Sequence, residues 1–274
     1  MSDVARETPA PAKLRIPLAR RLASSSLFLG CLSVVSVALL WEFALKIFPI
    51  QSYLLPPPTE IAAAMAGQFG LQMQHALVTL REILVGFALA VLIGVPIAIA
   101  MTFVPVFEKL FYPILVATQA IPKVAVAPLF LVWFGFGEAP KYAMATVIAV
   151  FPVIIDTAVG LRAIDPDMVR LAKSMRAGSV RTFWKVRLPI ALPSIFAGLK
   201  MAMTFSVIGA VVGEFVAGQS GLGYLIQAAT GSLQTNVAFA SIVLLSLIGI
   251  VLFFLVEGCE RLFVPWHHST ERLY

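Results

Sequence analysis

Charged residues are scarce in this sequence of 274 residues, where Asp, Glu, Lys and Arg together make up 12%. Soluble domains usually contain about 25% charged residues, whereas here 60% of the residues are hydrophobic and the mean hydropathy is +0.95. A soluble core of this size cannot enclose so many apolar side chains. The composition therefore predicts a membrane protein that crosses the bilayer several times.

The residues that most often build metal centres and disulfides are also few. The sequence has two cysteines, Cys31 and Cys259, and three histidines, of which His267 and His268 are adjacent. None of them has companions at the spacing of a zinc site, and the cysteines do not form a CxxC pair. We therefore predict neither a metal site nor a disulfide.

A phosphate-binding loop is absent too. The sequence has no Gly-x-x-x-x-Gly-Lys-Ser/Thr motif, and no glycine is followed directly by lysine. The chain therefore cannot hold ATP phosphates in that way. Its net charge of +6 and pI near 9.5 come from basic residues in predicted loops. Because these residues form no basic stripe with interleaved aromatic residues, we predict no nucleic-acid partner.

Long apolar segments fill most of the chain and predict an all-α fold with six transmembrane helices. Each segment is close to the ~20 residues that a helix needs to cross ~30 Å of hydrocarbon, and a helix satisfies its own backbone there. The predicted spans cover residues 27–48, 79–103, 110–135, 141–161, 190–214 and 237–258. They leave terminal tails at 1–26 and 263–274.

Lysine and arginine are distributed unevenly over the predicted loops. The tail 1–26 and the loop 162–189 are rich in them, whereas the loops 49–78 and 215–236 contain none. Cytoplasmic loops of membrane proteins carry an excess of basic residues. We therefore predict that both termini and the loop 162–189 are cytoplasmic.

The basic loop carries the signals of an amphipathic helix. Asp165 and Pro166 are typical of a helix start. The apolar side chains that follow recur at a helical spacing and form one face: Met168, Leu171, Ala172 and Met175. The basic side chains lie on the opposite side or at its edge: Arg170, Lys173 and Arg176.

A second helix follows, so that the loop forms a hairpin. Gly178 is expected to stop the first helix, and Ser179 to begin a second one through Val186. Leu188-Pro189 is expected to end the second helix and to start the fifth span. The apolar face of this hairpin needs a partner, which is either a groove on another protein or the anionic headgroups of the membrane.

Ionisable residues inside the predicted spans are candidates for function. Each costs about 2.5–3.5 kcal/mol at the bilayer centre. Lys123, Asp156 and Glu214 lie beside prolines or small residues, and they either line a translocation path or pair with one another. Arg81 and Glu82 lie near the end of a span, from where we expect both side chains to reach water.

The loop also carries a pattern that is known from a protein family. Residues 171–200 resemble the "EAA" loop of permease subunits of binding-protein-dependent ABC importers. Its pattern is Glu-Ala-Ala, three residues, Gly, nine residues and Ile-x-Leu-Pro. Val186, Leu188 and Pro189 match the end of this pattern in register, which puts Arg170 at the family's Glu and Arg176 at its Gly.

The resemblance covers about residues 38–262 and places a type-1 permease domain at 75–262. The segments 121–129, 133–137 and 213–226 are similar to the nitrate/sulfonate/taurine branch, which includes permeases for pyrimidines and riboflavin. The resemblance implies an importer of a small organic solute that is pyrimidine- or riboflavin-like, or sulfonate- or nitrate-like. It also implies the bacterial cytoplasmic membrane as the location.

The resemblance further implies a transport subunit without catalytic residues or a cofactor of its own. ATP would be bound and hydrolysed by separate ATPase subunits, and the solute would be delivered by a periplasmic or lipid-anchored binding protein. A second copy of the permease would complete the path. From the residues alone, an ion- or proton-coupled secondary transporter remains an alternative, with Asp156 and Glu214 carrying the coupling ion.

In this family the loop helix docks on the ATPase and transmits its closure to the spans. The residues that would do so here are Asp165, Met168, Arg170, Leu171, Ala172, Lys173, Met175, Arg176, Gly178, Val186, Leu188 and Pro189.

Overall fold

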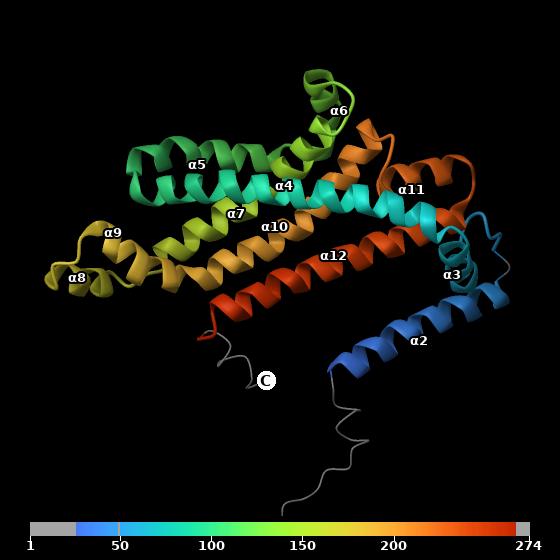
Figure 1. Cartoon of the computed structure of the whole chain (residues 1–274), viewed down its shortest axis with the longest axis horizontal. Coiled ribbons are helices and arrows are strands. Elements are labelled where there is room, and N and C mark those ends of the chain that lie inside the picture. Colours follow the sequence, from blue (N-terminus) through green and yellow to red (C-terminus); the bar gives the residue numbers. More distant parts are fainter. Residues whose placement is uncertain (1–25, 49, 267–274) are drawn as a thin grey trace, which may run out of the picture. The chain divides into compact units, whose positions relative to one another are not determined.

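The computed structural model describes residues 26–48 and 50–266, and these residues form helices and no strands (Figure 1). The predicted all-α fold is therefore confirmed. The chain divides into two compact units, Met1–Thr59 and Glu60–Tyr274. The first unit contains α2 (Ser26–Ile47), at the position of the first predicted span. Most of both predicted tails lies outside the described residues.

The second unit contains the remaining helices, and α3 begins two residues before its boundary. Their bounds are α3 Pro58–Gly67, α4 Phe69–Phe103, α5 Pro105–Ala120, α6 Lys123–Phe134, α7 Ala139–Arg162, α8 Pro166–Ser174, α9 Ser179–Thr182, the π-helix η1 Phe183–Arg187, α10 Leu188–Ala217, α11 Leu222–Gly231 and α12 Thr235–Phe263.

Four continuous helices within the described residues are long and apolar enough to cross a membrane. They are α4, α7, the run 179–217 that ends in α10, and α12, and they contain the second, fourth, fifth and sixth predicted spans. A fifth candidate is the pair α5 and α6. The count of six spans stays a prediction.

The segment 110–135, expected as one span, is instead two helices that meet at an angle of 101°. Ile121 and Pro122 lie between α5 and α6 in an extended conformation. Proline disfavours the helical conformation in the residue before it, so Pro122 accounts for the break. The break places Lys123 at the first turn of α6.

Helix α7 is the centre of the second unit, and it packs most extensively against α10 and α4. Of the apolar stretch of α7, 72% is buried, against 22% for α12. Small residues allow the close approach of α7 and α10. A Cβ atom on Gly209 would lie only 2.9 Å from the carbonyl oxygen of Met144.

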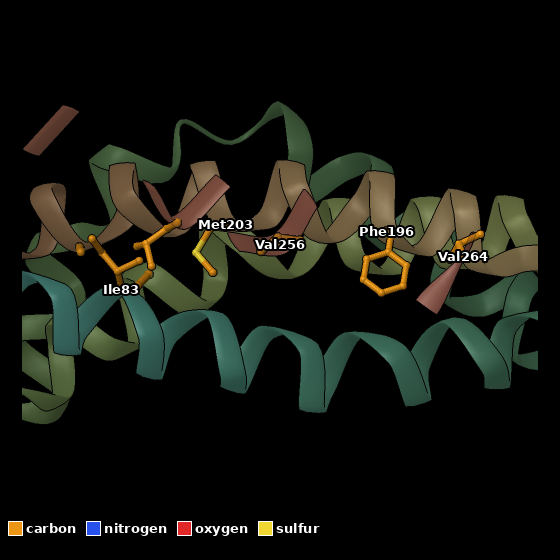
Figure 2. Packing of buried hydrophobic residues seen from close by; sticks show 8 residues of the cluster. Ile83, Phe196, Met203, Val256 and Val264 are labelled. Atoms are coloured by element: carbon orange, nitrogen blue, oxygen red, sulfur yellow. The ribbon is translucent and has the colours of Figure 1, made fainter. Parts of the chain in front are cut away.

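A row of apolar side chains joins α4, α10 and α12. Figure 2 shows Ile83, Met203, Val256 and Phe196 in a row along these helices, with Val264, which directly follows α12, at the end of the row. Because lipid is as apolar as these side chains, their close packing, more than the hydrophobic effect, holds the helices together.

The two ends of this bundle carry different elements. The hairpin of α8 and α9 lies at one end and α11 at the other (Figure 1). The candidate residues of the hairpin and those inside the spans therefore belong to the same compact unit.

Candidate functional site

The hairpin begins as its sequence predicts. Helix α8 starts at Pro166, and the Oδ1 of Asp165 accepts a hydrogen bond of 2.8 Å from the backbone N–H of Asp167. This bond satisfies one of the free donors at the start of a helix. The predicted capping role of Asp165 is confirmed.

The end of α8 differs from the prediction, because Arg176 and not Gly178 adopts the left-handed conformation. Arg176 has φ of 58°, whereas Gly178 is extended with φ of −66°. The N–H of Ala177 donates to the carbonyl of Ala172 at 3.0 Å. This is the Schellman arrangement, whose left-handed residue is usually glycine. The signal was present in the family pattern, which has Gly at the position of Arg176.

The apolar face of α8 is mostly open. Met168, Leu171 and Met175 are 47%, 58% and 76% exposed, while Ala172 is buried. Arg170 is exposed, and Lys173 falls within the same helix. Val180 and Trp184, from the second part of the hairpin, are also exposed apolar side chains. The hairpin therefore presents an apolar surface without a cover from its own described residues.

The second helix does not end at Leu188-Pro189 as predicted. A five-residue π-helix, which includes Val186, continues α9 into α10, and the N–H of Leu188 donates to the carbonyl of Phe183. Pro189 lies in the first turn of α10, where its missing N–H costs little. The second part of the hairpin and the span are therefore one continuous helix from 179 to 217.

Lys123 and Asp156 line the same cavity, as one of the two predictions for them requires. The cavity has a volume of about 330 Å³ and is open on one side, with Gln119 and Phe151 also in its wall. The Nζ of Lys123 lies 4.3 Å from the centroid of the Phe151 ring. Neither Lys123 nor Asp156 forms an ion pair within the described residues.

Glu214 lies apart from this cavity and is fully buried. Its Oε1 accepts a hydrogen bond of 2.6 Å from the hydroxyl of Thr79. Its Oε2 accepts from the N–H groups of Gly223 and Tyr224 at the start of α11. The N–H of Leu222 in turn donates to the Thr79 hydroxyl at 2.7 Å. Glu214 thus fastens α11 to α10 and α4.

A second buried pair adjoins Glu214. The Nζ of Lys141 lies 2.6 Å from the Oε1 of Glu82, and their side chains are 4% and 1% exposed. Glu82 is also a neighbour of Glu214. The three residues form what we call the enclosed cluster: Glu82, Lys141 and Glu214.

The expectation that Glu82 reaches water is wrong, while its neighbour Arg81 is exposed and forms an ion pair of 3.1 Å with Glu138. Sequence reasoning missed Glu82 and Lys141 because each lies near the predicted end of a span. The available signal was that two opposite charges lie at the same predicted end of two spans.

Among the described residues, no three His, Cys, Asp or Glu side chains are grouped closely enough to hold a metal ion. His267 and His268 lie outside those residues.

Comparisons with known proteins agree with this arrangement. Residues 90–266 match the family model described as binding-protein-dependent transport system inner membrane component. A probable ABC transporter permease protein of Haemophilus influenzae is 36% identical over 244 residues, which are 89% of this chain and 98% of the relative. The riboflavin transport system permease protein RibX of Chloroflexus aurantiacus is 36% identical over 235 residues, or 84% and 86% of the two chains.

A solved structure shares the fold. A chain of the MetNI methionine ABC transporter in an inward-facing conformation has a TM-score of 0.63 and 20% identity, covering 72% of this chain and 98% of that chain.

Proposed function

This chain belongs to the family of binding-protein-dependent transport system inner membrane components, and we propose that its hairpin is the element through which a separate ATPase drives transport. The chain is the permease component of an ABC importer, whose ATPase is a separate subunit and whose solute comes from a binding protein. The family therefore decides against the alternative of an ion- or proton-coupled secondary transporter.

One observation carries the proposal for the hairpin. Met168, Leu171 and Met175 form an exposed apolar face on α8, and a short turn joins α8 to the helix that runs without a break from residue 179 into α10. An amphipathic helix with such a face binds in an apolar groove through side chains at this spacing. Closure of the ATPase would then be passed to the spans as a rigid-body movement.

The other coupling residues would support this face. Asp165 fixes the start of α8, and Arg170 and Lys173 would give this helix a positive charge that favours an acidic partner. Arg176 and Gly178 shape the turn to the second helix, and Val186, Leu188 and Pro189 form the junction with α10. ATP would be bound by the ATPase alone. The basic hairpin and both termini would lie in the cytoplasm, with the chain in the bacterial cytoplasmic membrane.

We place the translocation path at the cavity of Lys123 and Asp156. Its open side exposes two opposite charges, one on the candidate span α7 and one at the start of α6 in the bent pair α5 and α6. Lipid on this side would cost about 2.5–3.5 kcal/mol for each charge, so a second copy of the chain would cover it and form a homodimer around the path. Glu214, which is fully enclosed, would hold α11 in place and would not contact the solute.

The solute would be small and organic. Relatives are named for transport of riboflavin, formylaminopyrimidine, taurine and aliphatic sulfonates. The cavity offers an ammonium group, a carboxylate, the Gln119 amide and an aromatic ring. A planar, hydrogen-bonding heterocycle of the pyrimidine or riboflavin kind uses all four, whereas a sulfonate- or nitrate-like anion would use mainly Lys123.

The test of docking is a pair of charge substitutions on the apolar face. In the transporter purified with its ATPase, Met168→Glu and Met175→Glu should weaken retention of the ATPase by about tenfold or more and abolish solute uptake, because each buries a charge in an apolar groove. Phe136→Glu is the control for retention, since Phe136 is 78% exposed, close to the 76% of Met175, but lies outside the hairpin.

Two outcomes would decide against docking. If both variants keep the ATPase and transport solute normally, the face is not a docking surface. If they keep the ATPase but the hairpin loses its affinity for vesicles of anionic lipid, the face is a lipid anchor, which is the second candidate role for a basic amphipathic hairpin.

A further inference from the structure

A second cavity lies between the hairpin and the ends of the spans, on the side away from the apolar face. It has a volume of about 390 Å³, and its wall contains three arginines from three elements: Arg162 of α7, Arg170 of α8 and Arg187 of η1. We call it the arginine cavity. On α8 the cavity is lined by Pro166, Val169 and Arg170. At 100° per residue these positions are opposite Met168, Leu171 and Met175.

The charges around the arginine cavity do not balance. Arg162 forms an ion pair of 2.7 Å with Glu108, and it donates to the carbonyl oxygen of Met101 at 3.2 Å. Arg170 pairs with Asp167 on the same helix at 2.9 Å, where both side chains are more than three-quarters exposed. Such an exposed pair is weak.

Arg187 has no carboxylate partner within the described residues. Its guanidinium carbon lies 4.9 Å from the centroid of the Phe103 ring. The ring holds the side chain at the wall by a cation–π contact and offers no negative charge. Three guanidinium groups therefore face one cavity with two carboxylates beside them, and the remaining charge of +1 is concentrated on Arg187.

We propose that the arginine cavity binds a phosphate-bearing anion. Guanidinium groups present paired donors that match the oxygens of a phosphate, and they bind it more specifically than lysine does. The cavity lies where the ends of α4 and α7 meet the hairpin, which is where the headgroup of an anionic lipid would reach it. Basic pockets between transmembrane helices bind such headgroups, and free phosphate offers the same chemistry.

A bound phosphate would brace the hairpin against the spans. Helix α8 packs little against the spans themselves, and the arginines of α7, α8 and η1 would share the anion. The apolar face of α8 points away and stays open, so a bound anion would leave Met168, Leu171 and Met175 free to dock on the ATPase. This inference goes beyond the proposed function, and its test does not need the ATPase to be active.

The test counts bound anions on the complete, purified transporter by native mass spectrometry. One arm uses nanodiscs of phosphatidylcholine alone, a second uses equal parts of phosphatidylcholine and phosphatidylglycerol, and a third adds inorganic phosphate to the first. Phosphatidylglycerol should be retained on the wild-type chain, and Arg187→Gln should weaken its binding by at least about fivefold. Arg181→Gln removes the same charge from an exposed site of the hairpin outside the cavity, and it should retain the lipid.

Each outcome has a defined meaning. Binding of inorganic phosphate that Arg187→Gln abolishes, without retention of phosphatidylglycerol, upholds the phosphate site and identifies free phosphate as its source. The proposal is overturned if Arg187→Gln and Arg181→Gln weaken anion binding equally. It is also overturned if the wild-type chain retains neither phosphatidylglycerol nor inorganic phosphate. Should Arg187→Gln fail to assemble, Arg170→Gln must show the same selective loss, since Arg170 is exposed on a short helix and lines the same cavity.

Discussion

The enclosed cluster and the open cavity both place ionisable residues in the apolar helices of the second unit, but their surroundings are opposite. In the cluster, Glu82, Lys141 and Glu214 are almost fully buried and hold one another or the backbone of α11. In the cavity, Lys123 and Asp156 are partly exposed and have no ion pair within the described residues. An ionisable side chain inside the membrane costs free energy, and the two sets offset this cost in different ways.

The difference separates structural from functional charge. A buried charged group that is paired within its own chain contributes to stability and specificity of the fold. A charge that faces an open cavity has a contact left to make, with solute, water or a second subunit. Substitutions in the cluster should therefore act on assembly, and substitutions in the cavity should act on transport.

The largest effect is expected for Lys141→Met. This change leaves the Glu82 carboxylate buried without its cation and next to another carboxylate, that of Glu214. It should lower the free energy of unfolding by about 3–5 kcal/mol. Denaturation of the purified protein in detergent would measure it. The control is Arg81→Met, which breaks a neighbouring ion pair whose side chains are 65% and 46% exposed and should cost less than about 1 kcal/mol.

A double substitution shows what Lys141 neutralises. Replacing both partners of a buried pair by apolar residues is often close to neutral, so Glu82→Leu combined with Lys141→Met should recover most of the lost stability. If the double variant is as unstable as Lys141→Met alone, Lys141 serves Glu214 and not Glu82, and our assignment of the pair is wrong.

A smaller effect on stability, but a large one on transport, is expected for Asp156→Asn. The side chain keeps its volume and loses no ion pair, so the free energy of unfolding should change by less than about 0.5 kcal/mol. Loss of a charged hydrogen-bond acceptor for the solute should slow uptake about tenfold. Uptake into proteoliposomes that contain the complete transporter would measure the rate.

The matched control for Asp156 is Glu257→Gln, which removes a carboxylate of α12 that pairs with Arg261 and does not line the cavity. It should leave uptake unchanged. If Asp156→Asn assembles and takes up solute normally, Asp156 does not line the path. The expectation that substitutions in the cavity act on transport would then be wrong for this residue.

Sequence reasoning found the helices and the hairpin because their signals are local. A run of apolar residues or a capping Asp165 acts within a few turns of chain, and both appear in the structure. The bend at Pro122 and the continuation through Pro189 depend on how a proline is accommodated by its neighbours. One broke a predicted span, and the other failed to break a predicted helix.

The partners of the charged residues could not be predicted from the sequence, for a different reason. Lys141 and Glu82 are 59 residues apart, and Thr79 and Glu214 are 135 apart. A single sequence gives the depth of each charge only to within a few residues and does not say which helices are neighbours. Pairing across spans therefore needed the structure, and so did the cavity that Lys123 and Asp156 share.

The smallest effect is expected for Arg176→Gly, in the exposed hairpin, where little is buried. A left-handed conformation costs a residue with a Cβ atom about 1–2 kcal/mol, part of which is offset because glycine gains more freedom in the unfolded chain. The end of α8 should therefore become more stable by about 0.5–1 kcal/mol. Hydrogen exchange of the Ala177 amide, which bonds to Ala172, should slow by about twofold to fivefold.

Gly178→Ala is the control for this position, because Gly178 has a negative φ and no atoms within 4 Å of an added Cβ. It should leave the exchange of Ala177 nearly unchanged. Faster exchange in Arg176→Gly would mean that the arginine side chain itself holds the turn. The turn of the exposed hairpin would then depend on a side-chain contact, as the packing of the enclosed cluster does.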